Sequence, residues 1–178
     1  MAGFYYYICT LPLLTFGEEL PMNSDEFVKN SSDWISVPET ERLKNLKIIP
    51  GEILDENTGA LEKNWYNWEI CLRNRLADHR AGKLTRDASE YIREYPDYFS
   101  EVESVVQEIT TISNPLSIEK KLDSIRWKKL GDMESGHEFD FEKLCIYKLK
   151  LMILEKWTER EEQRGFDNLD SILKEVYI

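Results

Sequence analysis

Helical spacing of large apolar residues is the feature that most restricts how this chain can fold. Between residues 59 and 82 such side chains recur at steps of three and four, which places them on one face of a helix. They are Leu61, Trp65, Trp68, Leu72 and Leu76. No stretch alternates apolar and polar residues strongly enough to indicate a sheet. We therefore predict an all-α protein in which about eight helices form a compact bundle.

Capping signals and proline or glycine residues set the boundaries of these helices. Ser24 is a good N-cap, Ser36 with Glu39 forms a capping box, and Asn114-Pro115 is a typical helix start. Two long helices, about 59–82 and 140–163, are expected to form the spine. The shorter helices are predicted from Ser24 through Trp34 and Ile35, from Ser36 to about Ile49, around 88–95, over about 97–112, over about 115–130 with a loop at 131–136, and over about 166–176.

The segment 4–16 is rich in aromatic and apolar residues and contains Pro12. Its tyrosines and isoleucine suit a strand or an extended segment packed on the core, and the alternative is a short helix that Pro12 ends or bends. Burying each large apolar side chain is worth roughly 1.5–3 kcal/mol. We therefore expect this segment, including Leu13, to be ordered and packed on the core.

The chain has 178 residues, which is enough for one domain or for two small ones. We predict a single helical domain over 1–178, and the alternative is a division into two lobes that meet near residues 82–97. The longest apolar-rich run, residues 144–154, contains Lys148 and Lys150 and is shorter than the roughly 20 residues of a membrane span. No signal peptide is recognisable. We expect a cytoplasmic protein that does not insert into a membrane but could lie at the inner membrane as part of a complex.

Charge and motifs argue against several functional classes. The net charge is -11, which disfavours nucleic acid as a partner. Glycine-rich nucleotide loops and paired-cysteine zinc spacings are absent from the sequence. Glu134 and His137 have a metal-ligand spacing, but only one copy is present, so we interpret them as a polar loop cluster. We predict no catalytic residues, no cofactor and no metal.

The three cysteines, Cys9, Cys71 and Cys145, are sparse and far apart, which fits reduced thiols that act as small buried side chains. The tryptophans at helical spacing are expected mainly in helix packing, with a protein interface as the other possibility. They are Trp65, Trp68, Trp127 and Trp157.

Polar residues in the helix 59–82 are the candidate site. Glu69 and Arg73 are spaced for a favourable helical ion pair, and an asparagine in mid-helix is kept when its amide is satisfied. Either an internal polar network or a partner-binding surface would account for them. The candidate residues are Glu69, Arg73, Asn74, Asp78 and Arg80. The trio Asp78-His79-Arg80 could also suggest acid–base chemistry, but neighbours on a helix point in different directions, so a charged helix face is expected.

Three stretches of the sequence resemble an uncharacterised bacterial family that is encoded among the genes of V/A-type ATP synthases, at the position of a C subunit. The most specific is Phe4-Tyr5-Tyr6-Tyr7-Ile8-Cys9-Thr10-Leu11-Pro12-Leu13-Leu14-x-Phe16. The second is Trp68-Glu69-x-x-Leu72-Arg73-Asn74-x-Leu76-Ala77-x-x-Arg80-Ala81. The third is Phe141-Glu142-x-Leu144-x-x-Tyr147-x-Leu149-Lys150-Leu151-x-Ile153-Leu154-x-x-Trp157.

The resemblance implies an accessory or coupling subunit of a rotary ATPase. The C subunit of these motors is a helical cup on the rotor, between the membrane ring and the central shaft. This chain is much shorter than a full C subunit, so the resemblance implies half of such a cup or a replacement with other contacts. The expected partners are other ATPase subunits of the rotor ring or central stalk. The alternatives are a stand-alone helical interaction module and, less favoured, a small enzyme that uses Arg73, Asn74 and Asp78.

Overall fold

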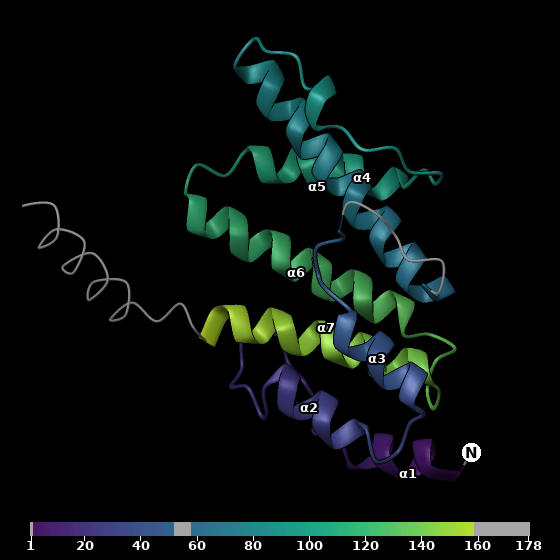
Figure 1. Cartoon of the computed structure of the whole chain (residues 1–178). Coiled ribbons are helices and arrows are strands. Elements are labelled where there is room, and N and C mark those ends of the chain that lie inside the picture. Colours follow the sequence, from purple (N-terminus) through teal and green to yellow (C-terminus); the bar gives the residue numbers. More distant parts are fainter. Residues whose placement is uncertain (1, 52–57, 159–178) are drawn as a thin grey trace, which may run out of the picture. The chain divides into compact units, whose positions relative to one another are not determined.

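The computed structural model describes residues 2–51 and 58–158, which form seven α-helices, one short 3₁₀-helix and no strand (Figure 1). The all-α class is therefore confirmed, and the described part has seven helices where about eight were predicted. The predicted last helix, 166–176, lies outside the described residues. The elements are α1 (Ala2–Thr10), α2 (Ser24–Ser31), α3 (Val37–Asn45), α4 (Ala60–Lys83), η1 (Ser89–Tyr91), α5 (Ser100–Thr110), α6 (Pro115–Met133) and α7 (Phe141–Thr158).

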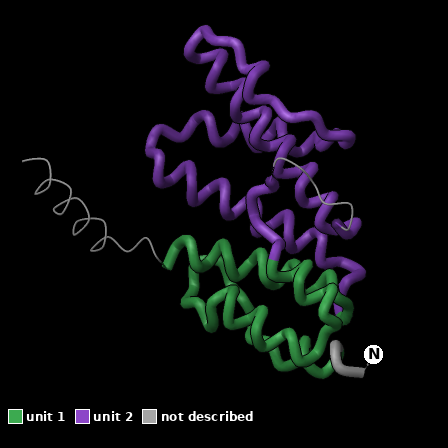
Figure 2. The backbone as a smooth tube through the Cα atoms, in the orientation of Figure 1, with its two compact units in different colours: residues 1–44, 139–178 green, residues 45–138 purple. Residues whose placement is uncertain are grey.

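The chain divides into two compact units, which are drawn in different colours in Figure 2. The first unit comprises residues 1–44 and 139–178, so it joins the N-terminal helices to α7. The second unit comprises residues 45–138 and contains α4, η1, α5 and α6. Residues 82–97, where the sequence suggested a boundary between lobes, lie inside this second unit.

Helix α7 is the core of the first unit, and α1 and α2 both pack against it. The sequence around 144–154 is apolar on nearly every side, which is typical of a helix enclosed by neighbours. The structure agrees with this interpretation, because most apolar side chains of α7 are almost completely inaccessible. The buried set is Leu144, Cys145, Ile146, Leu149, Leu151, Ile153 and Leu154.

Two charged side chains of α7 hold the ends of neighbouring helices. The Lys148 ammonium donates to the carbonyls of Leu43 (2.6 Å) and Lys44 (2.9 Å), which are last-turn acceptors of α3. Glu155 accepts hydrogen bonds from the backbone N–H and the hydroxyl of Ser24, which is the first residue of α2.

Helix α3 ends at Asn45, so its predicted extension to about Ile49 is wrong.

The N-terminal segment is a helix and not a strand, and Pro12 follows its end. Tyr7 is buried, and its hydroxyl lies 3.1 Å from the Ser31 hydroxyl of α2. The Tyr147 hydroxyl donates to the Pro12 carbonyl at 2.9 Å, which fixes the chain after α1 on the same unit. Only part of the segment is buried, however. Leu13 is 92% exposed, which contradicts its predicted packing.

In the second unit α4 packs against α5, and α5 packs against α6. The apolar stripe predicted for α4 faces this core, with Trp65 and Trp68 buried and their rings stacked at 5.5 Å between centroids. The Trp65 indole N–H donates to the Ile48 carbonyl at 3.1 Å. Both tryptophans therefore have the packing role that their spacing indicated.

Several predicted boundaries were wrong. Helix α2 ends at Ser31, so Trp34 and Ile35 lie beyond it, and its N-cap is Asn23, whose side chain accepts from the Glu26 N–H. Helix α6 continues to Met133 through part of the predicted loop 131–136. The predicted helix around 88–95 is reduced to the single 3₁₀ turn η1.

Helix α4 ends two residues before a threonine with left-handed backbone geometry. Thr85 has φ of 53°, the Arg86 N–H donates to the Ala81 carbonyl at 3.0 Å, and the Thr85 N–H donates to the Gly82 carbonyl at 3.3 Å. These two bonds form a Schellman motif, which usually places glycine at this position. The helix thus continues through Gly82, where its end or a break was expected.

Two of the three cysteines follow the prediction. Cys71 and Cys145 are buried, whereas Cys9 is exposed on α1, so the prediction of a buried side chain was wrong for Cys9. None of the three forms a disulfide.

Candidate functional site

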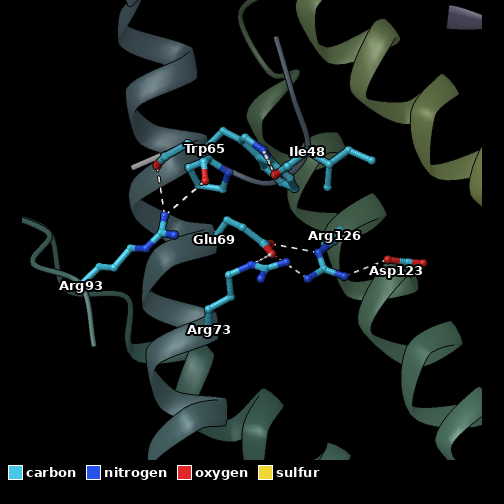
Figure 3. Close-up of polar contacts among 9 residues, drawn as sticks. Ile48, Trp65, Glu69, Arg73, Arg93, Asp123 and Arg126 are labelled. Carbon is cyan, nitrogen blue, oxygen red and sulfur yellow. Dashed lines mark hydrogen bonds and ion pairs between the residues drawn. The ribbon is translucent and has the colours of Figure 1, made fainter. Parts of the chain in front are cut away.

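A buried carboxylate on α4 organises the polar interior of the second unit (Figure 3). Glu69 is 0% exposed and accepts three N–H groups. Arg126 of α6 contributes two of them, from Nε to Oε2 at 2.9 Å and from a terminal nitrogen to Oε1 at 2.6 Å. Arg73, one helical turn along α4, donates its Nε to Oε1 at 2.9 Å.

Arg126 is in turn held by a second carboxylate on its own helix. Its other terminal nitrogen donates to Asp123 at 2.8 Å, and both side chains are nearly inaccessible. Burial alone would lower the pKa of the Arg126 guanidinium, but the attraction and hydrogen bonds of Glu69 and Asp123 outweigh it and raise that pKa above its ordinary value. Arg126 therefore stays charged, and the triad joins α4 to α6.

Asn74 fixes the segment that follows α4. Its amide nitrogen donates to the Arg93 carbonyl at 2.7 Å, and its amide oxygen accepts the Arg93 N–H at 3.1 Å. The Arg93 guanidinium then donates to the carbonyls of Pro50 (3.2 Å) and Gly51 (3.0 Å). One buried side-chain amide thus satisfies both backbone groups of a residue that lies outside any helix.

A pocket of about 330 Å³ lies beside this network, inside the second unit. Its walls combine apolar side chains with four arginines, one asparagine, one glutamate and one tyrosine. The lining residues are Ile49, Ile70, Arg73, Asn74, Leu76, Ala77, Arg80, Tyr91, Arg93, Glu119, Leu122 and Arg126.

The helical repeat of α4 explains one wall of this pocket. Residues 70, 73, 74, 77 and 80 are separated by steps of three, one, three and three, so they form a single stripe along the helix. The opposite stripe of α4 carries the buried tryptophans. One helix therefore presents apolar residues to the core and arginines to the pocket.

The structure brings most of the predicted site residues together. Glu69 and Arg73 form the expected ion pair, and Arg73, Asn74 and Arg80 share the pocket wall. Asp78 does not line the pocket, and its nearest described cation is Arg75, at 3.9 Å. These positions are compatible with either an internal network or a binding surface.

Sequence reasoning missed Asp123, Arg126 and Arg93. Asp123 and Arg126 are three residues apart, on the helical face that carries Leu122 and Leu130, and a charged pair on such a face is a signal that could have found them. Arg93 had no comparable signal, because its role depends on Asn74, 19 residues away.

The geometry offers little for acid–base catalysis. Three N–H groups from two arginines bind the Glu69 carboxylate, which gives it a structural role in holding α4 and α6 together. Asp78, His79 and Arg80 do not converge. Arg80 alone lines the pocket, while the His79 Nε2 is buried and has no hydrogen-bond partner among the described residues.

A second feature lies in the first unit, where exposed aromatic rings gather around α1. Tyr5 (59% exposed) contacts Phe139 (50%) at 4.5 Å between ring centroids, and Tyr6 (62%) contacts Trp34 (39%) at 5.7 Å. We call these four residues the α1 aromatic cluster. Trp34 also stacks on the buried Tyr7, at 5.8 Å, so the cluster is anchored to the core.

Within the described ranges, none of the helices combines the length and the apolar character that crossing a bilayer requires.

Comparison with known families gives one match. The model of a family described as "Protein of unknown function (DUF2764)" matches residues 85–176, which is more than half of the chain. Neither the curated proteins nor the solved structures contain a match to this chain.

Proposed function

We propose that this chain, which belongs to the DUF2764 family of proteins of unknown function, is a non-catalytic subunit of a bacterial V/A-type rotary ATPase. In this proposal it corresponds to part of the C subunit and works by binding neighbouring subunits of the rotor ring or central stalk. It would lie on the cytoplasmic side, at the membrane through the complex.

The observation that carries an interaction role is the α1 aromatic cluster. Tyr, Trp and Phe are enriched in the cores of protein interfaces, and contiguous exposed apolar surface commonly marks a binding site. Tyr5 and Tyr6 also belong to the most specific stretch of the resemblance, which begins at Phe4. The same short helix therefore supports both the interaction role and the assignment to the ATPase.

The interior of the second unit suits a subunit that must keep its shape under load. The Glu69–Arg126–Asp123 triad links two helices through several charge-assisted hydrogen bonds. Closely packed interiors deform little. A rotor part needs such stiffness, because torque must pass through it.

Co-purification from the native cell tests the proposal. The tagged full chain should recover ATPase subunits, and the variant Tyr6→Ser/Phe139→Ser should recover at least about tenfold less. The matched control is Tyr98→Ser, which removes an exposed aromatic ring from the other unit. Recovery of no ATPase subunit by the unaltered chain would reject the motor assignment.

Two alternatives remain distinct from this proposal. Specific capture of other proteins through the α1 aromatic cluster would favour a stand-alone interaction module. A small enzyme has one supporting observation, since Arg73 and Asn74 line the pocket. Against it, Asp78 lies outside that pocket, and the Glu69 carboxylate binds two arginines through three hydrogen bonds.

A further inference from the structure

The pocket beside α4 is a site of local positive charge on an acidic chain. The whole sequence carries a net charge of -11, yet four arginines line this one pocket of about 330 Å³. A volume of this size lies at the lower end of the range that small ligands or single side chains occupy. The charge contrast points to a ligand with an anionic group.

Of the four arginines, Arg73 and Arg80 make the fewest hydrogen bonds and so keep the most N–H groups for such a ligand. Arg126 directs Nε and both terminal nitrogens to Glu69 and Asp123. Arg93 is tied to the backbone carbonyls of Pro50 and Gly51. Arg73 uses only its Nε, and Arg80 has no hydrogen bond or ion pair within the described part of the chain.

Arg73 and Arg80 are placed to act together. They are seven residues apart on α4, which is two helical turns and a rise of about 10 Å. The Arg73 side chain is 43% exposed, and Arg80 is also exposed, so both reach the open side of the pocket. Between them the wall is formed by the amide of Asn74 and the methyl group of Ala77.

The balance of charges around the pocket favours an anion that carries one negative charge. The four arginines face three carboxylates, which are Glu69, Asp123 and the pocket-lining Glu119, so one positive charge is left over. A single carboxylate matches that excess, whereas a phosphate group with two or more charges would be left partly uncompensated. The apolar lining, which includes Ile70, Leu76 and Leu122, suits the aliphatic stem of an acidic side chain and an apolar neighbour.

We propose that this pocket binds one carboxylate carried by an acidic, partly apolar segment of a partner protein, and that the terminal nitrogens of Arg73 and Arg80 are its donors. The choice of a protein as the source of the carboxylate rests on the proposed function. Recognition of a carboxylate by a guanidinium fork is directional, so the pocket would set the register of the partner. The α1 aromatic cluster would supply separate, apolar contact area.

Solution NMR on the full chain tests the site without any knowledge of the partner. The probe is the blocked tripeptide Ac-Leu-Glu-Leu-NH₂, and its matched control is Ac-Leu-Gln-Leu-NH₂, which lacks the charge. We expect saturable shifts of the Nε–H signals of Arg73 and Arg80 with the glutamate peptide, and at least about tenfold weaker binding of the glutamine peptide. Absence of saturable shifts at millimolar glutamate peptide would overturn the proposal.

Variants that remove a positive charge distinguish a specific binding site from general electrostatic attraction of the peptide to the protein. Arg73→Gln/Arg80→Gln should weaken binding of the glutamate peptide by about tenfold or more. Arg86→Gln removes the same kind of charge from an exposed position of this unit outside the pocket and should leave binding within about twofold. Equal losses in all variants would contradict a specific site. Tighter binding of inorganic pyrophosphate than of the glutamate peptide, lost in the double variant, would replace the carboxylate by a phosphate ligand.

The outcome is independent of the motor assignment. Peptide binding at Arg73 and Arg80 without recovery of ATPase subunits would support the carboxylate site and reject the proposed role in the ATPase. Recovery of ATPase subunits by the unaltered chain, with no binding of the peptide, would support the proposed role in the ATPase and reject the carboxylate site.

Discussion

Arg126 and Glu69 lie 57 residues apart in the sequence and meet as a two-pronged ion pair, with N–O distances of 2.9 and 2.6 Å. Both side chains are almost fully removed from solvent. Buried ions are stable only when partners compensate the lost hydration. Glu69 and Arg126 therefore compensate each other's lost hydration. Asp123 adds a second ion pair to Arg126, and Arg73 adds one to Glu69.

Replacing Arg126 should be severely destabilising. Arg126→Met would leave the carboxylates of Glu69 and Asp123 buried without their main cation, and we expect the free energy of unfolding to fall by about 3–5 kcal/mol. Urea denaturation followed by circular dichroism measures it. The control is Arg73→Gln, which removes the exposed partner of the same carboxylate and should cost about 1 kcal/mol or less. Equal losses in the two variants would contradict the dominant role of the buried pair.

Asn74 should determine the order of the segment after α4. Asn74→Ala leaves the Arg93 N–H and carbonyl without their partner, so we expect a loss of about 1–3 kcal/mol in the free energy of unfolding. Hydrogen exchange should become faster around residues 88–97 and remain unchanged in α7. Asn64→Ala, at an exposed position of the same helix, is the control. Unchanged exchange around Arg93 in Asn74→Ala would show that other contacts hold the segment.

Lys148 should stabilise the first unit through the end of α3. Burial lowers the pKa of the Lys148 amine, while nearby carboxylates such as Asp25 and Glu155 oppose that shift. Lys148→Met would leave the carbonyls of Leu43 and Lys44 without this donor, and we expect a loss of about 1–3 kcal/mol by urea denaturation. Lys29→Met, at an exposed position of α2, should change stability by less than about 0.5 kcal/mol. A neutral or stabilising effect of Lys148→Met would mean that the cost of burying the amine exceeds the value of its hydrogen bonds.

The raised pKa of Tyr147 predicts how the free energy of unfolding changes at alkaline pH. Burial, assisted by repulsion from Tyr7, raises the pKa of the Tyr147 phenol to about 12 from its ordinary value of 10.0. Between these two values the unfolded chain loses this proton and the folded chain keeps it, so the free energy of unfolding should fall as the pH rises from about 10 to about 12. Tyr147→Phe should show a shallower fall. Denaturation of both forms below pH 10 and near pH 11 measures the difference, and parallel curves would reject the assignment.

Thr85 offers a stabilising substitution. A β-branched residue at φ of 53° is strained, and glycine is the usual residue at this position of a Schellman motif. Thr85→Gly should therefore raise the free energy of unfolding by up to about 1 kcal/mol. Thermal unfolding checks it, with Thr111→Gly as the control, because Thr111 has ordinary right-handed geometry and should be destabilised by glycine. A loss of stability in Thr85→Gly would show that its side chain contributes more than the strain costs.

Local sequence signals correctly predicted the features that depend on residues a few positions apart. The long helix α4 lies within one residue of its predicted ends, and the Asn114 cap and the Ser36–Glu39 capping box form as expected. The Glu69–Arg73 pair belongs to the same group, since one helical turn brings its members together. Such signals are complete within three or four residues, so no knowledge of the fold is needed to read them.

Helix packing, in contrast, determines which groups far apart in the sequence pair with one another. The segment around Arg93 has helical spacing, yet it is not an α-helix, and Asn74 of α4 satisfies the backbone N–H and carbonyl of Arg93. Arg126 became a partner of Glu69 because α6 packs where it can reach α4, which no local pattern encodes. The pocket between these elements exists for the same reason. Hydrogen bonds and charges can be satisfied by any nearby partner, and packing selects that partner.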